Sequence, residues 1–160
     1  MKQLLYLILI LPLLAMTPPN KEAKQRKVVE EYVHTLLNTD DDTIRAIRNN
    51  EDIAKLSSLL KLTRTYTKEE IDNAIDFLLF VKRTLKGHKY KILNFKEADE
   101  KLKTEGGAVA SDKGDVYYIY DKDLKGVFFQ AAVVVDDDNK IISIAIGMCL
   151  NPKRLCFLYL

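Results

Sequence analysis

Apolar and polar positions form their clearest pattern in the last third of the chain. Two apolar runs, residues 126–135 and 141–148, flank one acidic turn. Both runs are rich in β-branched residues, and together they predict a β-hairpin. Because the runs are apolar on both faces, we expect the hairpin at the centre of a sheet. Burial of each such side chain contributes roughly 1.5–3 kcal/mol, so the rest of the chain should fold around this hairpin.

The turn of this hairpin fixes its expected register. Residues 136–140 fit a three-residue loop, a type I turn followed by Asn139 in the left-handed region. This register places Val134 opposite Ile142, and a two-residue loop would regroup the two faces. One face is then bulky and the other small. The small face comprises Ala131, Ser143 and Ala145. Two copies of the chain could pair through this face in a homodimer.

Helical spacing dominates the first half of the chain. Apolar residues at intervals of three and four predict four helices. We expect them over residues 21–37, from about 40 to 48, from about 50 to 60, and from 67 to 85. Residues 40–42 and 50–52 suit helix starts. Thr67 and Glu70 form a capping box, and Gly87 ends the last helix.

Strand patterns fill the second half. Residues 90–96 and 116–120 predict two aromatic strands before the central hairpin, and residues 108–110 a short extra strand. The fold class is therefore α+β, with N-terminal helices packed on a curved antiparallel β-sheet formed by the C-terminal half. The alternative is a helical subdomain beside a small β-meander.

The chain begins with a pattern typical of a secretory signal peptide. A short positive start precedes an almost wholly apolar run, residues 4–14, and then Ala15. The run is shorter than the about 20 residues that span a bilayer. We assign residues 1–16 to the signal peptide, favour cleavage after Ala15, and expect one domain over residues 17–160. The protein would be secreted or periplasmic, without a stable membrane anchor; an uncleaved amphiphilic anchor is the alternative.

Charge and chemistry narrow the function classes. The chain has 25 basic and 23 acidic residues, a formal net charge of +2 that favours neither nucleic acid nor membranes. Its two histidines, His34 and His88, stand in unrelated contexts, so we expect neither a metal site nor a cofactor. The carboxylates cluster at helix starts and turns rather than inside apolar strands, where burial would raise their pKa for acid–base work. We therefore assign no catalytic residue and favour a protein that is not an enzyme.

The order of elements resembles a known superfamily. Helices precede the strands YKILNFK, VYYIY and VVVDDDNKIISIAIG. This order is similar to the nuclear transport factor 2-like superfamily, a cystatin-like α+β cone of curved sheet closed by helices. The last strand–acidic turn–strand unit resembles its small secreted bacterial members. The resemblance implies a fold and a pocket but no reaction, because the acid that enzymes such as ketosteroid isomerase place in the cone has no match here.

The expected function follows from these points. We expect a non-catalytic binding or interaction module with a mainly apolar pocket for a small apolar ligand or a protein partner. Its polar ligand-binding groups would be Gln130, Tyr118 and Tyr120. The alternative is a small-molecule isomerase or hydrolase of the same superfamily, for which His88 and Asp115 are the candidate groups.

The two cysteines give a separate expectation. If residues 151–154 form a turn, Cys149 faces Cys156 across a last hairpin. Directly opposed antiparallel residues lie within disulfide range, and an exported protein meets an oxidising compartment. We therefore predict a disulfide that holds the apolar tail on the sheet. The alternative is two separate buried thiols.

Overall fold

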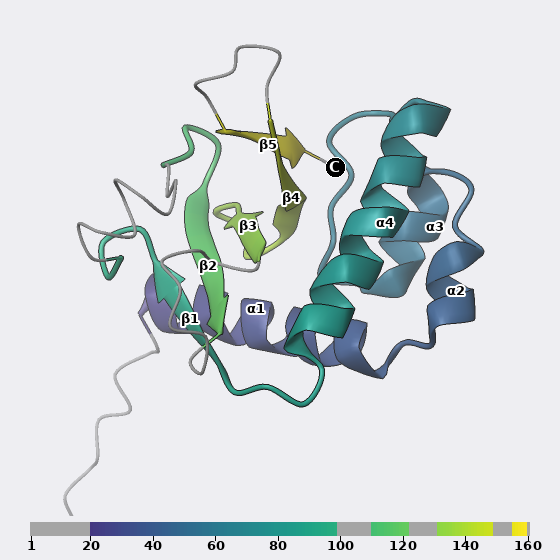
Figure 1. Ribbon diagram of the computed structural model, residues 1–160. Helices are drawn as coiled ribbons and strands as arrows, with labels where there is room; N and C mark the ends of the chain where they lie inside the picture. The colour runs from purple at the N-terminus through teal and green to yellow at the C-terminus, as the bar shows by residue number, and fades with distance from the viewer. Residues whose placement is uncertain (1–19, 99–109, 122–130, 149–154, 160) are drawn as a thin grey trace, which may run out of the picture.

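The computed structural model describes residues 20–98, 110–121, 131–148 and 155–159, and shows four helices followed by an antiparallel sheet (Figure 1). The helices are α1 (Lys21–Asn38), α2 (Asp41–Arg45), α3 (Asn50–Leu56) and α4 (Lys68–Leu85). The strands are β1 (Tyr90–Asn94), β2 (Asp115–Asp121), β3 (Ala131–Val135), β4 (Ile141–Met148) and β5 (Leu155–Tyr159). The predicted α+β class, with helices before the sheet, is confirmed.

The sheet is a meander in which each strand pairs with its neighbours in sequence. Its order is β1-β2-β3-β4-β5, and every pairing is antiparallel. β3 is the central strand of the sheet, as predicted from the apolar residues on both of its faces. Figure 1 shows α2, α3 and α4 gathered on one side of the molecule and the sheet on the other, with α1 running beneath both. Helices and sheet share one apolar cluster, which the alternative of a separate helical subdomain would lack.

Each helix begins at a residue whose side chain accepts a backbone hydrogen bond from the first turn. These N-cap residues are Asn20, Asp40, Asn49 and Thr67. The Thr67 hydroxyl and the Glu70 carboxylate bond to each other's backbone N–H groups, which confirms the predicted capping box. The oxygen side chains satisfy donors that a helix start otherwise leaves free.

α3 begins at Asn50, close to the predicted start, but its N-cap is Asn49, and Asn50 has another role. The Asn50 side chain is buried, donates from Nδ2 to the Arg64 carbonyl at 2.5 Å, and accepts from the Tyr66 N–H at 2.8 Å. A buried amide that pairs both of its ends avoids the cost of an unsatisfied polar group. Asn50 thus holds the segment before α4 against the start of α3.

α3 ends at Leu56, earlier than predicted, and Leu59 and Leu60 lie beyond it. Leu60 forms an isolated parallel bridge with Ile141. The Ile141 N–H donates to the Leu59 carbonyl at 2.8 Å, and the Lys61 N–H donates to the Ile141 carbonyl at 2.9 Å. These leucines therefore extend the sheet beside the start of β4 instead of continuing the helix.

The turn of the central hairpin has the predicted form. Asn139 has a φ of 58°, in the left-handed region. Its N–H donates to the Asp136 carbonyl at 3.1 Å, and the Asp136 N–H donates to the Lys140 carbonyl at 2.9 Å. Val135 then pairs with Ile141, as the three-residue loop requires.

One residue beyond the turn, a β-bulge overturns the predicted register. Val134 lies opposite Ser143 and not opposite Ile142, because β4 carries one extra residue at this point. Since side chains alternate with a period of two, the extra residue moves every later side chain of β4 to the other face. Ile144 consequently joins the cluster that faces the helices, whereas Ile142 lies in the opposite cluster with Val134, on the face that the predicted register gave it.

The two sheet faces bury two separate apolar clusters. The larger cluster joins the helices to the face of the sheet that includes Tyr117, Ile119, Ala131, Val133, Val135, Ile141 and Ile144. The smaller cluster occupies the other face and contains Ala98, Val116, Tyr118, Ala132, Val134 and Ile142. Ala131 is 4 % exposed and Ser143 is 0 % exposed. These two residues of the expected small face are therefore buried within the chain, and the homodimer stays a prediction.

The last strand pairs with β4 in a register other than the predicted one. Cys156 lies opposite Gly147, and Leu155 lies opposite Met148. The prediction that Cys156 faces Cys149 is wrong by two residues. Cys149 lies outside the described residues, so the disulfide itself stays a prediction. The signal peptide, Gln130 and most of the expected strand at 108–110 also lie outside them.

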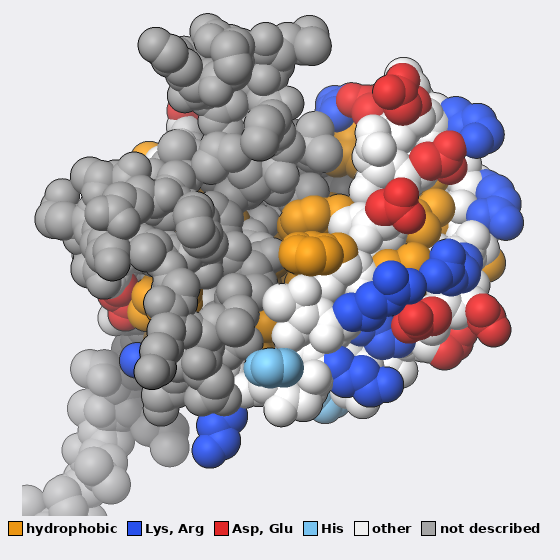
Figure 2. All heavy atoms as spheres, in the orientation of Figure 1, with side chains coloured by type: hydrophobic (Ala, Val, Ile, Leu, Met, Phe, Trp, Pro, Cys, Tyr) orange, Lys and Arg blue, Asp and Glu red, His pale blue; other side chains and the backbone are white. Residues whose placement is uncertain are grey.

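Figure 2 shows acidic and basic side chains interspersed over the described part of one face of the molecule, with apolar side chains between them. Neither sign of charge dominates this face. None of the helices in the described part of the chain combines the length and the apolar composition that a membrane span requires. Among the same residues, no group of three or more His, Cys, Asp or Glu side chains is placed to hold a metal ion.

Candidate functional site

A cleft of about 410 Å³ lies between the first turns of α1 and the start of β2. It combines apolar wall residues with polar groups from α1 and β2. Its lining residues are Lys21, Glu22, Gln25, Asn94, Phe95, Lys96, Ala110, Ser111, Gly114, Asp115, Val116 and Tyr117. We call it the α1–β2 cleft.

Tyr117 and Gln25 form the buried polar centre of the α1–β2 cleft, each 1 % exposed. The Tyr117 hydroxyl donates to Gln25 Oε1 at 3.1 Å and lies 3.4 Å from the Glu22 carbonyl oxygen. Gln25 Nε2 donates in turn to the Asp136 carbonyl at 3.1 Å. Burial raises the pKa of Tyr117 to about 12, so its hydroxyl keeps its proton at neutral pH.

An ion-pair group stands beside this centre. The Lys21 ammonium lies 2.9 Å from the Asp115 carboxylate and 2.7 Å from the Asp137 carboxylate. The hydrogen bond from Lys21 lowers the pKa of Asp115, and the hydrogen bonds to Asp137 and Asp115 raise the pKa of Lys21. Both groups therefore stay charged well to either side of neutral pH.

Gly114 allows the backbone to approach closely at one side of the α1–β2 cleft. A Cβ atom on Gly114 would lie 2.3 Å from the carbonyl oxygen of Val135. The chain can enter β2 beside the end of β3 only because this side chain is absent. The partly buried Phe95 and the buried Val116 supply apolar wall next to it.

Arg26 separates the α1–β2 cleft from a second hollow further along α1. Its guanidinium donates to the Ile92 carbonyl, to Glu97 at 2.6 Å and to Glu22 at 3.2 Å. It also lies 5.9 Å from the centre of the Tyr117 ring. Burial opposes its charge, but Glu97 and then Glu22 raise the pKa of Arg26 above its ordinary value. Arg26 thus fastens α1 to β1 between the two hollows.

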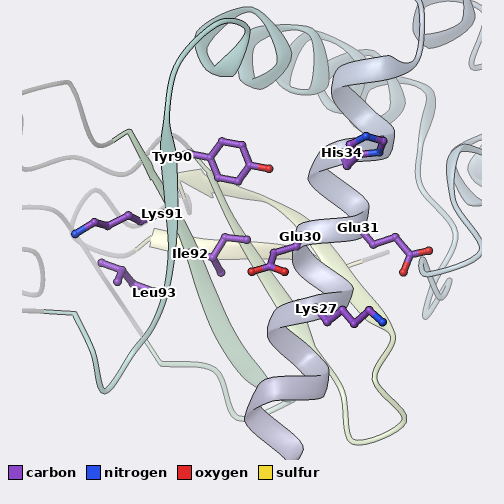
Figure 3. Close-up of a pocket in the computed structure, with 8 residues that line it drawn as sticks. All are labelled: Lys27, Glu30, Glu31, His34, Tyr90, Lys91, Ile92 and Leu93. Atoms are coloured by element: carbon purple, nitrogen blue, oxygen red, sulfur yellow. The ribbon is translucent and has the colours of Figure 1, made fainter. Parts of the chain in front are cut away.

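The second hollow, of about 790 Å³, is an open groove between α1 and β1 (Figure 3). We call it the α1–β1 groove. Figure 3 shows Tyr90, Ile92 and Glu30 pointing into the space between the two elements, whereas Glu31 and Lys91 point away from it. Its lining residues are Lys27, Glu30, Glu31, His34, Tyr90, Lys91, Ile92 and Leu93.

The ligand-binding tyrosines predicted from the sequence lie on the opposite face of the sheet from Tyr117. Tyr118 is 0 % exposed within the smaller apolar cluster, and Tyr120 is partly buried. Of the hollows formed by the described residues, neither the α1–β2 cleft nor the α1–β1 groove is lined by Tyr118 or Tyr120. Gln130 lies outside the described residues, so a site formed by these three residues stays a prediction.

The candidate catalytic groups of the enzyme alternative lie far apart. His88 follows α4 just before β1, and Asp115 opens β2. Tyr90 pairs with Asp121 and Asn94 with Tyr117, so His88 and Asp115 lie at opposite ends of this strand pair. The rise of a strand separates such positions by on the order of 20 Å. The two groups cannot act on one substrate atom.

Sequence analysis missed Gln25 and Tyr117. Gln25 precedes Val29, Tyr32 and Leu36 at helical spacing, and all four are buried. A polar residue in line with an apolar stripe was therefore the available signal for Gln25. Tyr117 carries no comparable signal, because the strand sequence is aromatic on both faces and does not say which one the helices cover.

Comparisons with protein-family models, with curated proteins and with solved structures found no match to this chain. The resemblance to the nuclear transport factor 2-like superfamily thus stays a prediction from the sequence. The function has to be argued from the hollows themselves.

Proposed function

We propose that the protein is a non-catalytic binding module that holds a small amphipathic molecule in the α1–β2 cleft. The observation that carries this proposal is the convergence of Tyr117, Gln25 and the Lys21–Asp115 pair beside an apolar wall. Mainly apolar hollows with a few fixed polar groups are the usual form of small-molecule sites. The ligand would place its apolar part against Phe95 and a hydrogen-bonding group towards Lys21 or Asp115.

The charge states of the cleft favour recognition over proton transfer. An efficient general acid or base has a pKa near the working pH. Here the pKa of Asp115 is lowered, that of Lys21 is raised, and that of Tyr117 is raised to about 12. All three shifts lead away from neutrality. An isomerase or hydrolase would need a different group in this position.

The proposed setting is outside the cytoplasm, in a secreted or periplasmic protein. This part rests on the sequence of residues 1–16, and the superfamily resemblance supports it because small secreted bacterial members share the last hairpin. The mass of the mature protein recovered from an exporting host tests it. Removal of a leader ending at about Ala15 is the expected result, and a full-length chain retained inside the cell would contradict it.

A thermal-shift screen with amphipathic small molecules tests the cleft. A ligand at about 100 times its Kd stabilises the native state by about 2.7 kcal/mol, which raises the Tm by several degrees. We expect Tyr117→Phe to reduce this shift, because it removes the hydroxyl that holds Gln25. Tyr118→Phe is the matched control on the other sheet face. Hits that ignore Tyr117→Phe but are lost in Tyr118→Phe would contradict the proposed cleft and return the site to the residues predicted from the sequence.

A further inference from the structure

The outer edge of β1 carries backbone groups that the sheet leaves unpaired. β1 is the first strand in the sheet order, so only its inner edge pairs with β2. In an antiparallel strand, successive residues direct their N–H and C=O groups to opposite edges. The Ile92 carbonyl accepts from Arg26, and the Asn94 N–H donates to Glu97 at 2.8 Å. Ile92 and Asn94 therefore face outwards, and by the same alternation Tyr90 does too.

The two ends of this outer edge differ. At Asn94 the edge is closed, because the Asn94 carbonyl also accepts from the N–H groups of Glu97 and Ala98 at 3.1 Å. At the other end, no hydrogen bond within the described chain engages the N–H of Ile92 or either backbone group of Tyr90 on this side. Such a row of unpaired groups is a template for an added strand. The open stretch coincides with the α1–β1 groove.

The groove has the side chains that would select such a strand. Glu30 points into the space beside Tyr90 and Ile92 in Figure 3. Burial raises the pKa of Tyr90, and the negative charge of Glu30 adds to this shift. No salt bridge of the described residues engages Glu30, whereas Arg26 nearby is bound to two carboxylates. Lys27 and Lys91 also line the groove, but Glu30 is the charged side chain that Figure 3 shows between α1 and β1, so a negative charge faces the apolar floor.

We propose that the α1–β1 groove binds an extended peptide segment of a partner protein, one with alternating basic and apolar residues, by strand addition to Tyr90–Ile92. Main-chain hydrogen bonds to Tyr90 and Ile92 supply the affinity, and alternate side chains meet the groove. Because successive side chains of a strand point to opposite faces, the basic side chains lie on the helix side of the sheet, towards Glu30, and the apolar ones lie on the other side, beside the partly buried Leu93. This site is independent of the α1–β2 cleft, from which Arg26 separates it.

The test uses the purified chain and a fluorescent Lys-Val alternating peptide of about eight residues, near the length of an ordinary strand. The Glu-Val peptide of equal length and a Lys-Val peptide N-methylated at alternate residues are the probes for charge and for backbone pairing. Glu30→Gln is compared with the matched variant Glu31→Gln, since the two residues are adjacent but only Glu30 points into the groove. Backbone amide exchange of Ile92 and Tyr90 is followed by NMR with and without peptide.

We expect the Lys-Val peptide to bind about tenfold more tightly than the Glu-Val peptide, and the N-methylated peptide to lose binding. Glu30→Gln should weaken binding about two- to fivefold, the usual effect of one exposed charge, while Glu31→Gln should weaken it less, because Glu31 points away from the groove. Exchange at Ile92 should slow when peptide is bound. Binding without slower exchange at Ile92, equal losses in the two glutamine variants, or no binding of the Lys-Val peptide would overturn the proposal. Slower exchange that tracks protein concentration without peptide would also overturn it, because a second copy of the chain would then be the occupant.

Discussion

Replacing Gln25 by leucine tests whether one buried amide ties α1 to the sheet. Gln25 bonds on one side to the Tyr117 hydroxyl and on the other to the Asp136 carbonyl, each at 3.1 Å. Leucine of similar size would fill the space but pair with neither group. A buried polar group left unsatisfied costs roughly 1–3 kcal/mol.

The surviving partners set the expected magnitude. Without Gln25 the Tyr117 hydroxyl still has the Glu22 carbonyl at 3.4 Å, and the Asp136 carbonyl still accepts from the Asn139 N–H at 3.1 Å. Neither group is fully orphaned, so we expect Gln25→Leu to lower the free energy of unfolding by about 1–2 kcal/mol rather than by the sum of two full penalties. Tyr117→Phe should cost a similar amount, because it strips Gln25 Oε1 of its donor.

Urea denaturation of a double-mutant cycle provides the assay. Removing both partners of a hydrogen bond costs less than the two single losses added together, so the Gln25→Leu/Tyr117→Phe variant should be more stable than additivity predicts by about 0.5–1.5 kcal/mol. An unchanged m-value is the control for two-state unfolding. Single effects that add without coupling would refute the reasoning, since the Tyr117–Gln25 bond would then carry no energy of its own.

Three further predictions address pH, packing and the cysteines. Arg64 lowers the pKa of Glu70 to about 2, so this carboxylate stabilises the fold above the pKa of about 4.3 that it has when unfolded. Its contribution to stability should fade as the pH falls from about 4.3 towards 2. Glu70→Gln should therefore flatten the acid unfolding curve over that pH range, and an unchanged slope would contradict the pairing with Arg64. Gly114→Ala should lower the free energy of unfolding in chemical denaturation by roughly 1–3 kcal/mol, because the added Cβ would overlap a backbone carbonyl of β3. An unchanged free energy of unfolding would show that the strands can move apart at this position. The disulfide predicted from the sequence requires Cys149 opposite Cys156, whereas Cys156 lies opposite Gly147 in the sheet. Mass spectrometry of the exported, unreduced protein decides it: a Cys149–Cys156 bond would require another register of the last two strands, and two alkylatable thiols after denaturation without reductant would exclude the bridge.

Local chemistry carried most of the fold prediction. Thr67 with Glu70, Gly87 at the end of α4, and Asn139 in the turn are residues whose own side chains or backbone freedom decide the conformation around them. Such signals act over a few residues, so they can be read before any tertiary contact is known. The same holds for the position of β3, since strands with two apolar faces have to be covered on both sides.

The β-bulge escaped prediction because nothing in the local sequence requires it. Residues 141–144 are Ile-Ile-Ser-Ile, and a regular strand would accept them equally well. The bulge places Ile141 and Ile144 together in the larger cluster and leaves the small, fully buried Ser143 opposite Val134. Packing against the helices therefore decides the register, and such a preference is invisible without knowing which face they cover.

The same uncertainty about which face the helices cover applies to the tyrosines of β2. Tyr117, Tyr118 and Tyr120 are chemically equivalent in the sequence, and only their position along the strand assigns them to a face. The structure puts Tyr117 under α1, where its hydroxyl meets Gln25, and buries Tyr118 in the smaller cluster. The residue types could thus predict a tyrosine as a polar group of the proposed site. Only the fold could select which tyrosine this is.

The acidic turn at residues 136–138 links the folding centre to both hollows. It was expected to act only as a hairpin turn, yet Lys21 from α1 binds Asp137, Lys61 binds Asp136 at 2.7 Å, and Gln25 donates to the Asp136 carbonyl. Exposed ion pairs of this kind add little stability singly, but the Lys21–Asp137 pair together with the buried Gln25 amide fixes one orientation of α1 over the sheet. Because α1 forms one wall of the α1–β2 cleft and one wall of the α1–β1 groove, the hairpin that nucleates the sheet also sets the shape of the two surfaces proposed to bind ligands.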